Sequence, residues 1–177
     1  MDLGFEVVDM GEPDHPTEGE QAPDFTRPLV NDEYWADVAL SDLDGPVCLV
    51  FYSMDGAFPG TYIWSEMRDR GFDDLGATVV GLSISTPYAH KRLIEDNDLG
   101  ETGFRFFSDP ANAVAEAYGI TNNLDGMTGI TEPRPATFVL DDDRTVRDAW
   151  VAREWPDLPD YDDLETAVLE AVEATDG

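Results

Sequence analysis

The stretch VCLVFY at residues 47–52 is continuously apolar and partly β-branched. Such a run suits a strand that is buried on both faces of a sheet. A similar run, TVVGLSI, follows at residues 78–84, and the segment GTYIWSEMRDR at residues 60–70 between them has apolar side chains spaced for one face of a helix. Two buried strands joined by one helix predict a βαβ unit with parallel strands and a right-handed crossover.

On either side of this unit the chain continues to alternate between strand and helix patterns. Thr86 and the proline after it form an N-cap and a first helical residue, which predicts a helix to about residue 97. Asp109 is also followed by a proline, and Gly119 is expected to end that second helix. The other predicted elements are strands at residues 5–8, 104–107, 137–140 and 146–151, a loop at 120–134, a turn at 141–144, and a C-terminal helix with the apolar stripe Leu164, Val168, Leu169 and Val172.

Length and composition predict one folded domain. The chain has 177 residues, of which 42% are hydrophobic and 11% aromatic, and a disordered acidic chain would be much poorer in aromatic side chains. Residues 1–18 carry glycine, proline and acidic side chains with little periodicity, so we interpret them as an N-terminal arm. Residues 19–177 then form the single domain.

The formal net charge is −29, from 39 acidic and 10 basic side chains. Nucleic acids and anionic membranes are bound by clusters of Lys and Arg, so we expect neither as a partner. Acidic residues are spread along the whole chain, and Lys91 is the only lysine. At molar salt the Debye length falls to about 3 Å and the repulsion between these charges nearly vanishes. The composition resembles that of cytosolic proteins from extreme halophiles, and an acidic protein of an ordinary cytosol is the alternative.

Cys48 is the only cysteine, which excludes an intramolecular disulfide and a multi-cysteine metal site. The N-terminus lacks the basic start and apolar stretch of a signal peptide, and no run approaches the length of a membrane span. We therefore expect a cytoplasmic protein. The sequence also lacks a glycine-rich phosphate loop and a metal-ligand motif, so we expect neither a cofactor nor a metal.

Several short motifs occur in the order found in one known family. They resemble the motifs of the peroxiredoxins, the alkyl hydroperoxide reductase and thiol-specific antioxidant family. The resemblance implies an α/β, thioredoxin-like fold with a central mixed sheet flanked by helices and a peroxiredoxin-type insertion. The matching segments are GEQAPDF at 19–25, GPVCLVFY at 45–52, VVGLSISTPYAHK at 79–91, FSD at 107–109, VAEAYG at 114–119 and TFVLD at 137–141.

The active-site pattern of the family is changed in this chain. Peroxiredoxins reduce peroxides with a cysteine in the pattern P-x-x-x-T-x-x-C, whose thiolate becomes a sulfenic acid. An ungapped alignment from residues 51–52 places Ser53 at the proline, Ala57 at the threonine and Gly60 at the peroxidatic cysteine. The resemblance thus predicts a degenerate site without its nucleophile. The smaller side chains at positions 57 and 60 are expected to widen the pocket.

The arginine of the family is also displaced. It usually stands in the pattern R-x-T-F, but here Pro135 occupies its place and Arg134 stands one residue earlier. A proline directly before such a strand also resembles the cis-proline of thioredoxin-like redoxins. The sequence leaves open whether the bond before Pro135 is cis or trans.

Five groups of residues have both a structural and a functional interpretation. Cys48 lies within a predicted buried strand, so core packing is expected, with a redox thiol as the alternative. We interpret His90 as a packing or surface residue rather than a base, and His15 as part of the arm. Asp55 lies in the loop with the changed pattern; an acidic residue there is expected by chance among 39 acidic side chains, and a role as an acid or base is the alternative. Tyr62, Trp64 and residues 155–159 are expected to pack in the core or beside it, and a surface for a partner is the alternative. Residues 141–143 are expected to form a solvated turn rather than a cation site.

Two functions follow from the resemblance and the changed site. The first is a non-catalytic peroxiredoxin-like protein with a binding or regulatory role. Its partner would be another peroxiredoxin, a thioredoxin or a small ligand, and the family resemblance also makes a homodimer plausible. The second is an antioxidant thiol peroxidase that uses Cys48 and an external thiol reductant.

Overall fold

The computed structural model describes residues 7–58, 60–123 and 128–176. Three short 3₁₀ helices, at Leu40–Asp42, Phe72–Asp74 and Gly100–Thr102, connect the regular elements. The helices are α1 (Gly60–Asp69), α2 (Pro87–Asp96), α3 (Ala113–Ala117) and α4 (Tyr161–Asp176). The strands are β1 (Val8–Asp9), β2 (Thr26–Val30), β3 (Trp35–Ala39), β4 (Val47–Phe51), β5 (Thr78–Ser83), β6 (Arg105–Ser108), β7 (Thr121–Asn122), β8 (Glu132–Pro133), β9 (Ala136–Leu140), β10 (Val146–Val151) and β11 (Glu154–Trp155).

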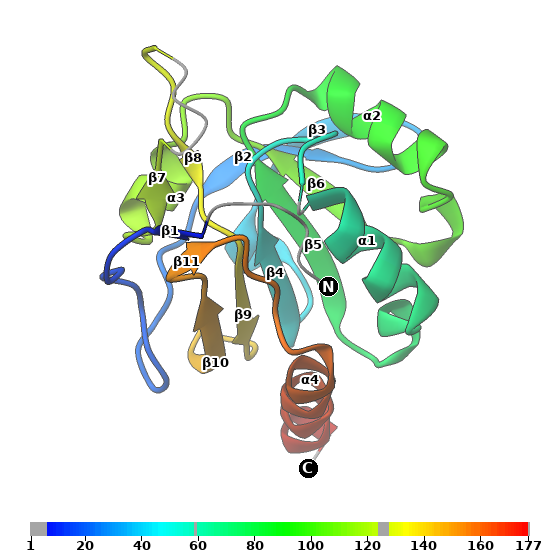
Figure 1. Ribbon diagram of the computed structural model, residues 1–177. Coiled ribbons are helices and arrows are strands. Elements are labelled where there is room, and N and C mark those ends of the chain that lie inside the picture. Colours follow the sequence, from blue (N-terminus) through cyan, green and yellow to red (C-terminus); the bar gives the residue numbers. More distant parts are fainter. Residues whose placement is uncertain (1–6, 59, 124–127, 177) are drawn as a thin grey trace.

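A seven-stranded mixed sheet with the order β10-β9-β4-β5-β6-β2-β3 forms the centre of the molecule. Strands β4, β5 and β6 are parallel, whereas β9, β10, β2 and β3 join antiparallel. Helix α1 connects β4 to β5 and α2 connects β5 to β6 (Figure 1). The predicted βαβ unit is therefore confirmed.

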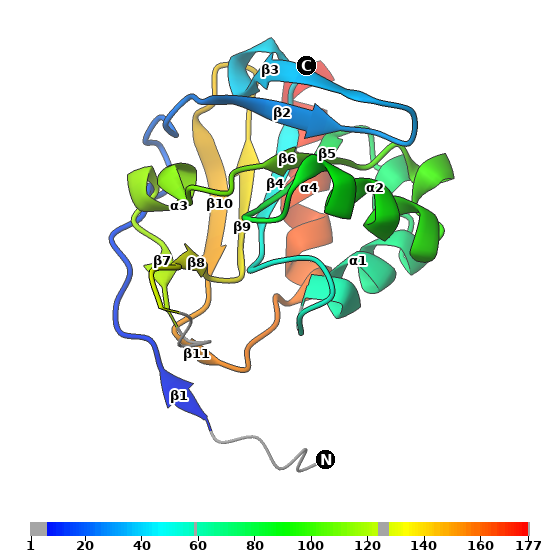
Figure 2. The same ribbon diagram turned by 90° about the horizontal axis from the view of Figure 1, so that it is seen from above.

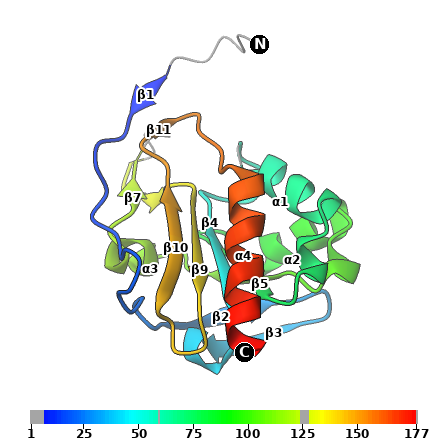
Figure 3. The same ribbon diagram turned by 90° about the horizontal axis from the view of Figure 1, so that it is seen from below.

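Helices cover both faces of the sheet. One face packs against α1, α2 and α4, and the opposite face packs against α3 and the segments beside it (Figures 2 and 3). Side chains of β4 alternate between the two cores, with Cys48 and Val50 in the first and Leu49 and Phe51 in the second. All five residues of β4 are buried, which explains its continuous apolar run.

Several predicted elements form where the sequence indicates. Thr86 caps α2, because its side-chain oxygen accepts a hydrogen bond from the backbone N–H of Ala89. The predicted turn at residues 141–144 closes the hairpin of β9 and β10 with a hydrogen bond from Arg144 N–H to the Asp141 carbonyl. In the stripe predicted for α4, Leu164 and Val168 are buried as expected.

Other predictions were wrong or incomplete. Strands β2 and β3 were not predicted, because Pro28 lies within β2 and β3 is a half-exposed edge strand with a mixed pattern. The helix expected from Asp109 begins only at Ala113: the Asp109 backbone N–H still bonds to β5, while its carboxylate accepts a hydrogen bond from the Val114 N–H. The loop expected at 120–134 contains the paired strands β7 and β8, and Leu169 in the predicted stripe of α4 is 45% exposed. Of the strand expected at residues 5–8, residues 5 and 6 lie outside the described residues, and Val8 is part of β1.

The described part of the N-terminal arm lies along the domain. β1 pairs with β11, and the backbone N–H of Gly19 bonds to the Val146 carbonyl at the edge strand β10. A Cβ atom on Gly119 would lie only 1.9 Å from the carbonyl oxygen of Asp14, and Gly119 has a φ of +72°. Glycine suits position 119 for two reasons: there is no space for a Cβ atom, and the positive φ is a conformation that other residues rarely adopt. None of the helices in the described residues is long and apolar enough to cross a membrane.

Candidate functional site

The loop that follows β4, in which the sequence predicts a changed active-site pattern, lies at the carboxyl ends of the parallel strands, where α/β sheets commonly place their binding sites. β4 ends at Phe51, and the described loop runs from Tyr52 to Phe58 before α1 begins at Gly60. Ser83 and Ser108, at the same ends of β5 and β6, are both buried. The structure thus brings polar side chains from three adjacent strands to one edge.

Gly60 is buried at the first residue of α1, against the ring of Tyr52. A Cβ atom on Gly60 would lie 2.7 Å from Cδ2 of Tyr52, closer than real Cβ atoms approach. The expected widening of the pocket at position 60 is therefore wrong, because the tyrosine ring fills that space. Ala57 is half-buried in the loop, and Ser53 is 9% exposed.

Tyr52, Asp55 and His90 form a buried cluster beneath the loop. The Tyr52 hydroxyl donates a hydrogen bond of 2.5 Å to Oδ1 of Asp55, and Nδ1 of His90 lies 2.8 Å from Oδ2 of the same carboxylate. The Tyr52 oxygen is 3.3 Å from His90 Nδ1. Burial, followed by the nearby charge of Asp55, raises the pKa of the Tyr52 phenol well above its usual value, so this phenol keeps its proton.

The cluster is tied to the neighbouring strands. Nε2 of His90 lies 3.1 Å from the carbonyl oxygen of Phe107 in β6, and the His90 ring stacks on Phe106 with centroids 5.6 Å apart. The backbone N–H of Asp55 donates to the hydroxyl of Ser85, just after β5. Sequence reasoning considered Asp55 and His90 one by one and missed their pairing, since only the fold brings the loop and α2 together.

Cys48 lies in the middle of β4, with Val79 of β5 and Val139 of β9 as its neighbours in the sheet. Its side chain is completely buried. Burial, with a smaller effect from the charge of Asp148, raises the pKa of the Cys48 thiol to about 12. At neutral pH the thiol is therefore protonated and shielded from solvent.

Arg134 binds the N-terminal arm. Its guanidinium group donates hydrogen bonds to the carbonyl oxygens of Met10 at 2.6 Å, Gly11 at 2.8 Å and Ala152 at 3.3 Å. Burial lowers the pKa of Arg134, against a smaller opposite effect of Asp9. The peptide bond before Pro135 is trans, since the two cis bonds in the described residues precede Pro46 and Pro156.

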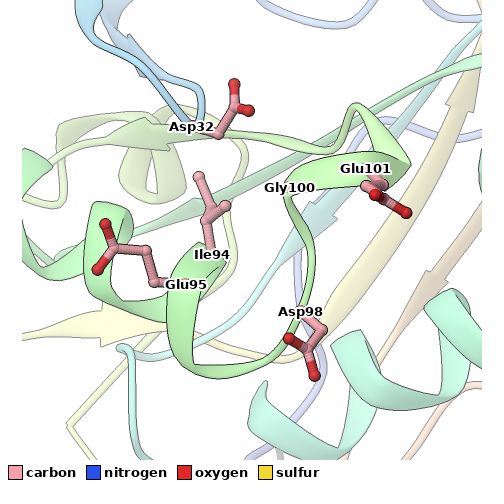
Figure 4. A pocket seen from close by; sticks show the side chains of 6 residues that line it. All are labelled: Asp32, Ile94, Glu95, Asp98, Gly100 and Glu101. Carbon is pink, nitrogen blue, oxygen red and sulfur yellow. The ribbon is translucent and has the colours of Figure 1, made fainter.

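The surface of the molecule carries a partly exposed aromatic group and an acidic pocket. The aromatic surface considered from the sequence is only partly exposed: Tyr62 is 48% exposed, but Trp64 is completely buried, and Trp155 packs edge-to-face with Phe58. A surface pocket of about 480 Å³ beside α2 has an acidic lining (Figure 4). The residues that line it are Asp32, Ile94, Glu95, Asp98, Gly100 and Glu101. No group of three or more His, Cys, Asp or Glu side chains in the described residues is arranged to hold a metal ion.

Known proteins are similar to this chain in sequence. Peroxiredoxin-2 of Mus musculus is 30% identical over 116 residues, which span 62% of this chain and 59% of that protein. The chloroplastic 2-Cys peroxiredoxin BAS1 of Arabidopsis thaliana is 29% identical over 122 residues, 64% of this chain and 46% of that protein. The matched region thus spans between about half and three fifths of the length of these two relatives.

Solved structures agree with the architecture. Peroxidoxin BcpB from Mycobacterium tuberculosis superposes with a TM-score of 0.69 at 25% identity, covering 90% of this chain and 98% of that one. AhpC of Enterococcus faecalis superposes with a TM-score of 0.73 at 18% identity, covering 91% and 95%. The fold expected from the motifs, a thioredoxin-like peroxiredoxin fold with a central mixed sheet between helices, is confirmed. The sequence matches the AhpC/TSA family over residues 19–149, most of its length, and the chain therefore belongs to the AhpC/TSA family.

Proposed function

We propose that this chain is a non-catalytic member of the AhpC/TSA family that acts by binding, in a regulatory or scaffolding role. The observation that carries the proposal is the environment of Gly60. The family pattern places the nucleophilic sulfur at this position, and here a Cβ atom alone would meet the Tyr52 ring at 2.7 Å. The position supplies neither a thiol nor the space for one.

Cys48 is the only sulfur nucleophile that the chain has to offer. A peroxidatic thiol must ionise near neutral pH and must meet the peroxide. Cys48 is completely buried, and the pKa of about 12 leaves almost no thiolate at neutral pH. These two properties favour a packing role for Cys48 over a redox role.

Arg134 supports the same interpretation. An arginine close to the thiol stabilises the thiolate and holds the peroxide in the family's mechanism. Here Arg134 is 7% exposed, and its guanidinium group donates hydrogen bonds to the carbonyl oxygens of Met10, Gly11 and Ala152. Its hydrogen bonds stabilise the N-terminal arm, so it is not free to bind a peroxide.

The experiment is peroxide consumption in concentrated potassium chloride, with dithiothreitol or thioredoxin as reductant. The wild type and Cys48→Ser are compared with an active cysteine-containing AhpC assayed in the same buffer. We expect both forms of this chain to match the reductant-only blank. Turnover that disappears in Cys48→Ser would identify a displaced peroxidatic thiol, and turnover that persists in Cys48→Ser would identify a peroxidase without a thiol. Either result overturns the proposal.

The binding partner we propose is a protein of the same family, starting with a second copy of this chain. Two copies of this chain, each with a formal net charge of −29, repel one another, so a homodimer can form only where salt screens that repulsion. Sedimentation equilibrium in molar potassium chloride tests this directly, with a dimer mass expected. A monomer mass at all protein concentrations would exclude self-association and direct the search to other AhpC/TSA chains.

A further inference from the structure

The two ring nitrogens of His90 contact different oxygen atoms, and the nature of each oxygen indicates whether the nitrogen beside it carries a hydrogen. Its ring is completely buried, and Nε2 lies 3.1 Å from the carbonyl oxygen of Phe107. A backbone carbonyl can only accept a hydrogen bond, so Nε2 must carry a hydrogen. One of the two ring nitrogens of His90 is therefore protonated whatever the state of the other.

The other nitrogen faces the carboxylate of Asp55. Nδ1 lies at an ion-pair distance of 2.8 Å from Oδ2, and apart from this contact the buried oxygen has no hydrogen-bond partner among the described residues. The Tyr52 phenol cannot serve this contact, because its single hydrogen is used in the 2.5 Å bond to Oδ1. A neutral imidazole would thus place a lone pair against a buried carboxylate oxygen, whereas an imidazolium ion supplies both the hydrogen and the balancing charge.

We propose that His90 is a proton-dependent latch: the imidazolium form holds the loop at residues 53–58 against α2 and β6, and loss of its proton releases the loop. When the proton is lost, the buried Asp55 carboxylate loses the positive charge that lies 2.8 Å from its Oδ2. The loop can then regain solvation for Asp55 by leaving α2.

In the part of the chain that the structure describes, Asp55 is the charged side chain in contact with the His90 ring, and the other contacts of the ring are uncharged. The loop contributes Asp55, and the end of β4 contributes Tyr52. β6 contributes the uncharged ring of Phe106 and the carbonyl of Phe107. Asp109, just after β6, is engaged elsewhere: one oxygen pairs with Arg27 at 2.8 Å and the other accepts the Val114 N–H. On α2 itself, the His90 backbone N–H bonds to the Thr86 carbonyl.

Hydrogen exchange read by mass spectrometry tests the latch. Peptides that span residues 53–58 are followed at about pH 6 and about pH 8.5, on either side of the ordinary histidine range, and rates are corrected for intrinsic exchange. Molar potassium chloride screens the general effect of pH on the surface charge. We expect the protection factor of the loop to fall about tenfold or more in the wild type, the effect of losing one hydrogen bond to a charged group.

Two variants separate His90 from a general effect of pH. The chain has only two histidines, so His15→Gln is the matched control and must keep the wild-type response. His90→Gln must show low protection of the loop at both pH values. Asp55→Asn, which removes the charge that the imidazolium balances, must also lose the pH response, and it serves if His90→Gln fails to fold.

The protonation of His90 is checked separately by ¹⁵N NMR of its ring. At about pH 6, within the ordinary range, both ring nitrogens should carry a hydrogen while the loop is protected. A neutral ring under a protected loop would overturn the proposal. Loop protection that stays constant between the two pH values in the wild type would overturn it as well, as would a pH response that disappears in His15→Gln.

Discussion

Replacing Gly60 by alanine should destabilise the protein, although alanine is the better helix former. The added Cβ would lie 2.7 Å from Cδ2 of Tyr52 and 3.5 Å from Cγ and Cε2 of the same ring. The ring cannot swing away cheaply, because its hydroxyl bonds to Asp55 and its face and edges pack against Trp64 and Phe106. Such overpacking costs about 1–3 kcal/mol, whereas an exposed Gly→Ala change in a helix gains at most about 1 kcal/mol.

If the overpacking cost lies near the middle of its range, at about 2 kcal/mol, and the helix gain is at most about 1 kcal/mol, the free energy of unfolding should fall by about 1–2 kcal/mol. For a chain of this length that corresponds to a fall in Tm of about 2–8 °C. Thermal unfolding by circular dichroism in molar potassium chloride measures it. Gly100→Ala is the matched control, since Gly100 is exposed, begins a short 3₁₀ helix and would bring its Cβ no closer than 3.8 Å to Asp32.

Gly100→Ala should change the free energy of unfolding by no more than about 0.5 kcal/mol. A double-mutant cycle with Tyr52→Leu locates the clash: the cost of Gly60→Ala should shrink when the ring is gone, giving a coupling of about 1 kcal/mol. The reasoning is refuted if Gly60→Ala is neutral or stabilising in the wild type. It is also refuted if the cost is unchanged in the Tyr52→Leu background, because the ring would then not be the obstacle.

Three further outcomes are expected. Maleimide should modify Cys48 only as fast as the protein unfolds, because the thiol is buried and has a pKa of about 12; rapid labelling of native protein would contradict the burial. Arg134→Met should cost about 2 kcal/mol through its lost hydrogen bonds to Met10 and Gly11 and should make the N-terminal arm sensitive to protease, unlike the control Arg147→Met on a half-exposed side chain. Potassium chloride should raise Tm up to molar concentrations because it screens the charge of −29, and a Tm that is flat or falls with salt would argue against charge repulsion as a destabilising force.

The fold was accessible from the sequence where local patterns and tertiary packing agree. The runs at residues 47–52 and 78–84 are buried on both faces, so their continuous apolar character is itself the signal of parallel central strands. β2 and β3 gave no such signal, since the hairpin lies at the edge of the sheet and β3 is half-exposed. Its existence depends on pairing with β6, a contact that no local pattern encodes.

The candidate site was less accessible for a related reason. The sequence predicts changes from the family pattern at Ser53, Ala57 and Gly60, but the consequence of such a change depends on what fills the space it leaves. Two smaller side chains suggested a wider pocket, and the structure has the Tyr52 ring at position 60 instead. Likewise, Arg134 stands one residue from its expected place, and only the path of the arm shows what it binds.

The absence of a side chain at Gly60 and the presence of the buried cluster are physically connected. Tyr52 blocks a side chain at Gly60 because its ring is fixed, and it is fixed because its hydroxyl bonds to Asp55. The carboxylate of Asp55 is held in turn by His90, whose Nδ1 lies 2.8 Å from Oδ2. A cysteine restored at Gly60 would therefore have to displace a ring that is held by a chain of contacts reaching to β6. If the latch at His90 opens, Tyr52 loses part of that restraint, so Gly60→Ala should be less destabilising at about pH 8.5 than at about pH 6, on the two sides of the ordinary histidine range. An equal cost at both pH values would show that the ring is held by packing alone.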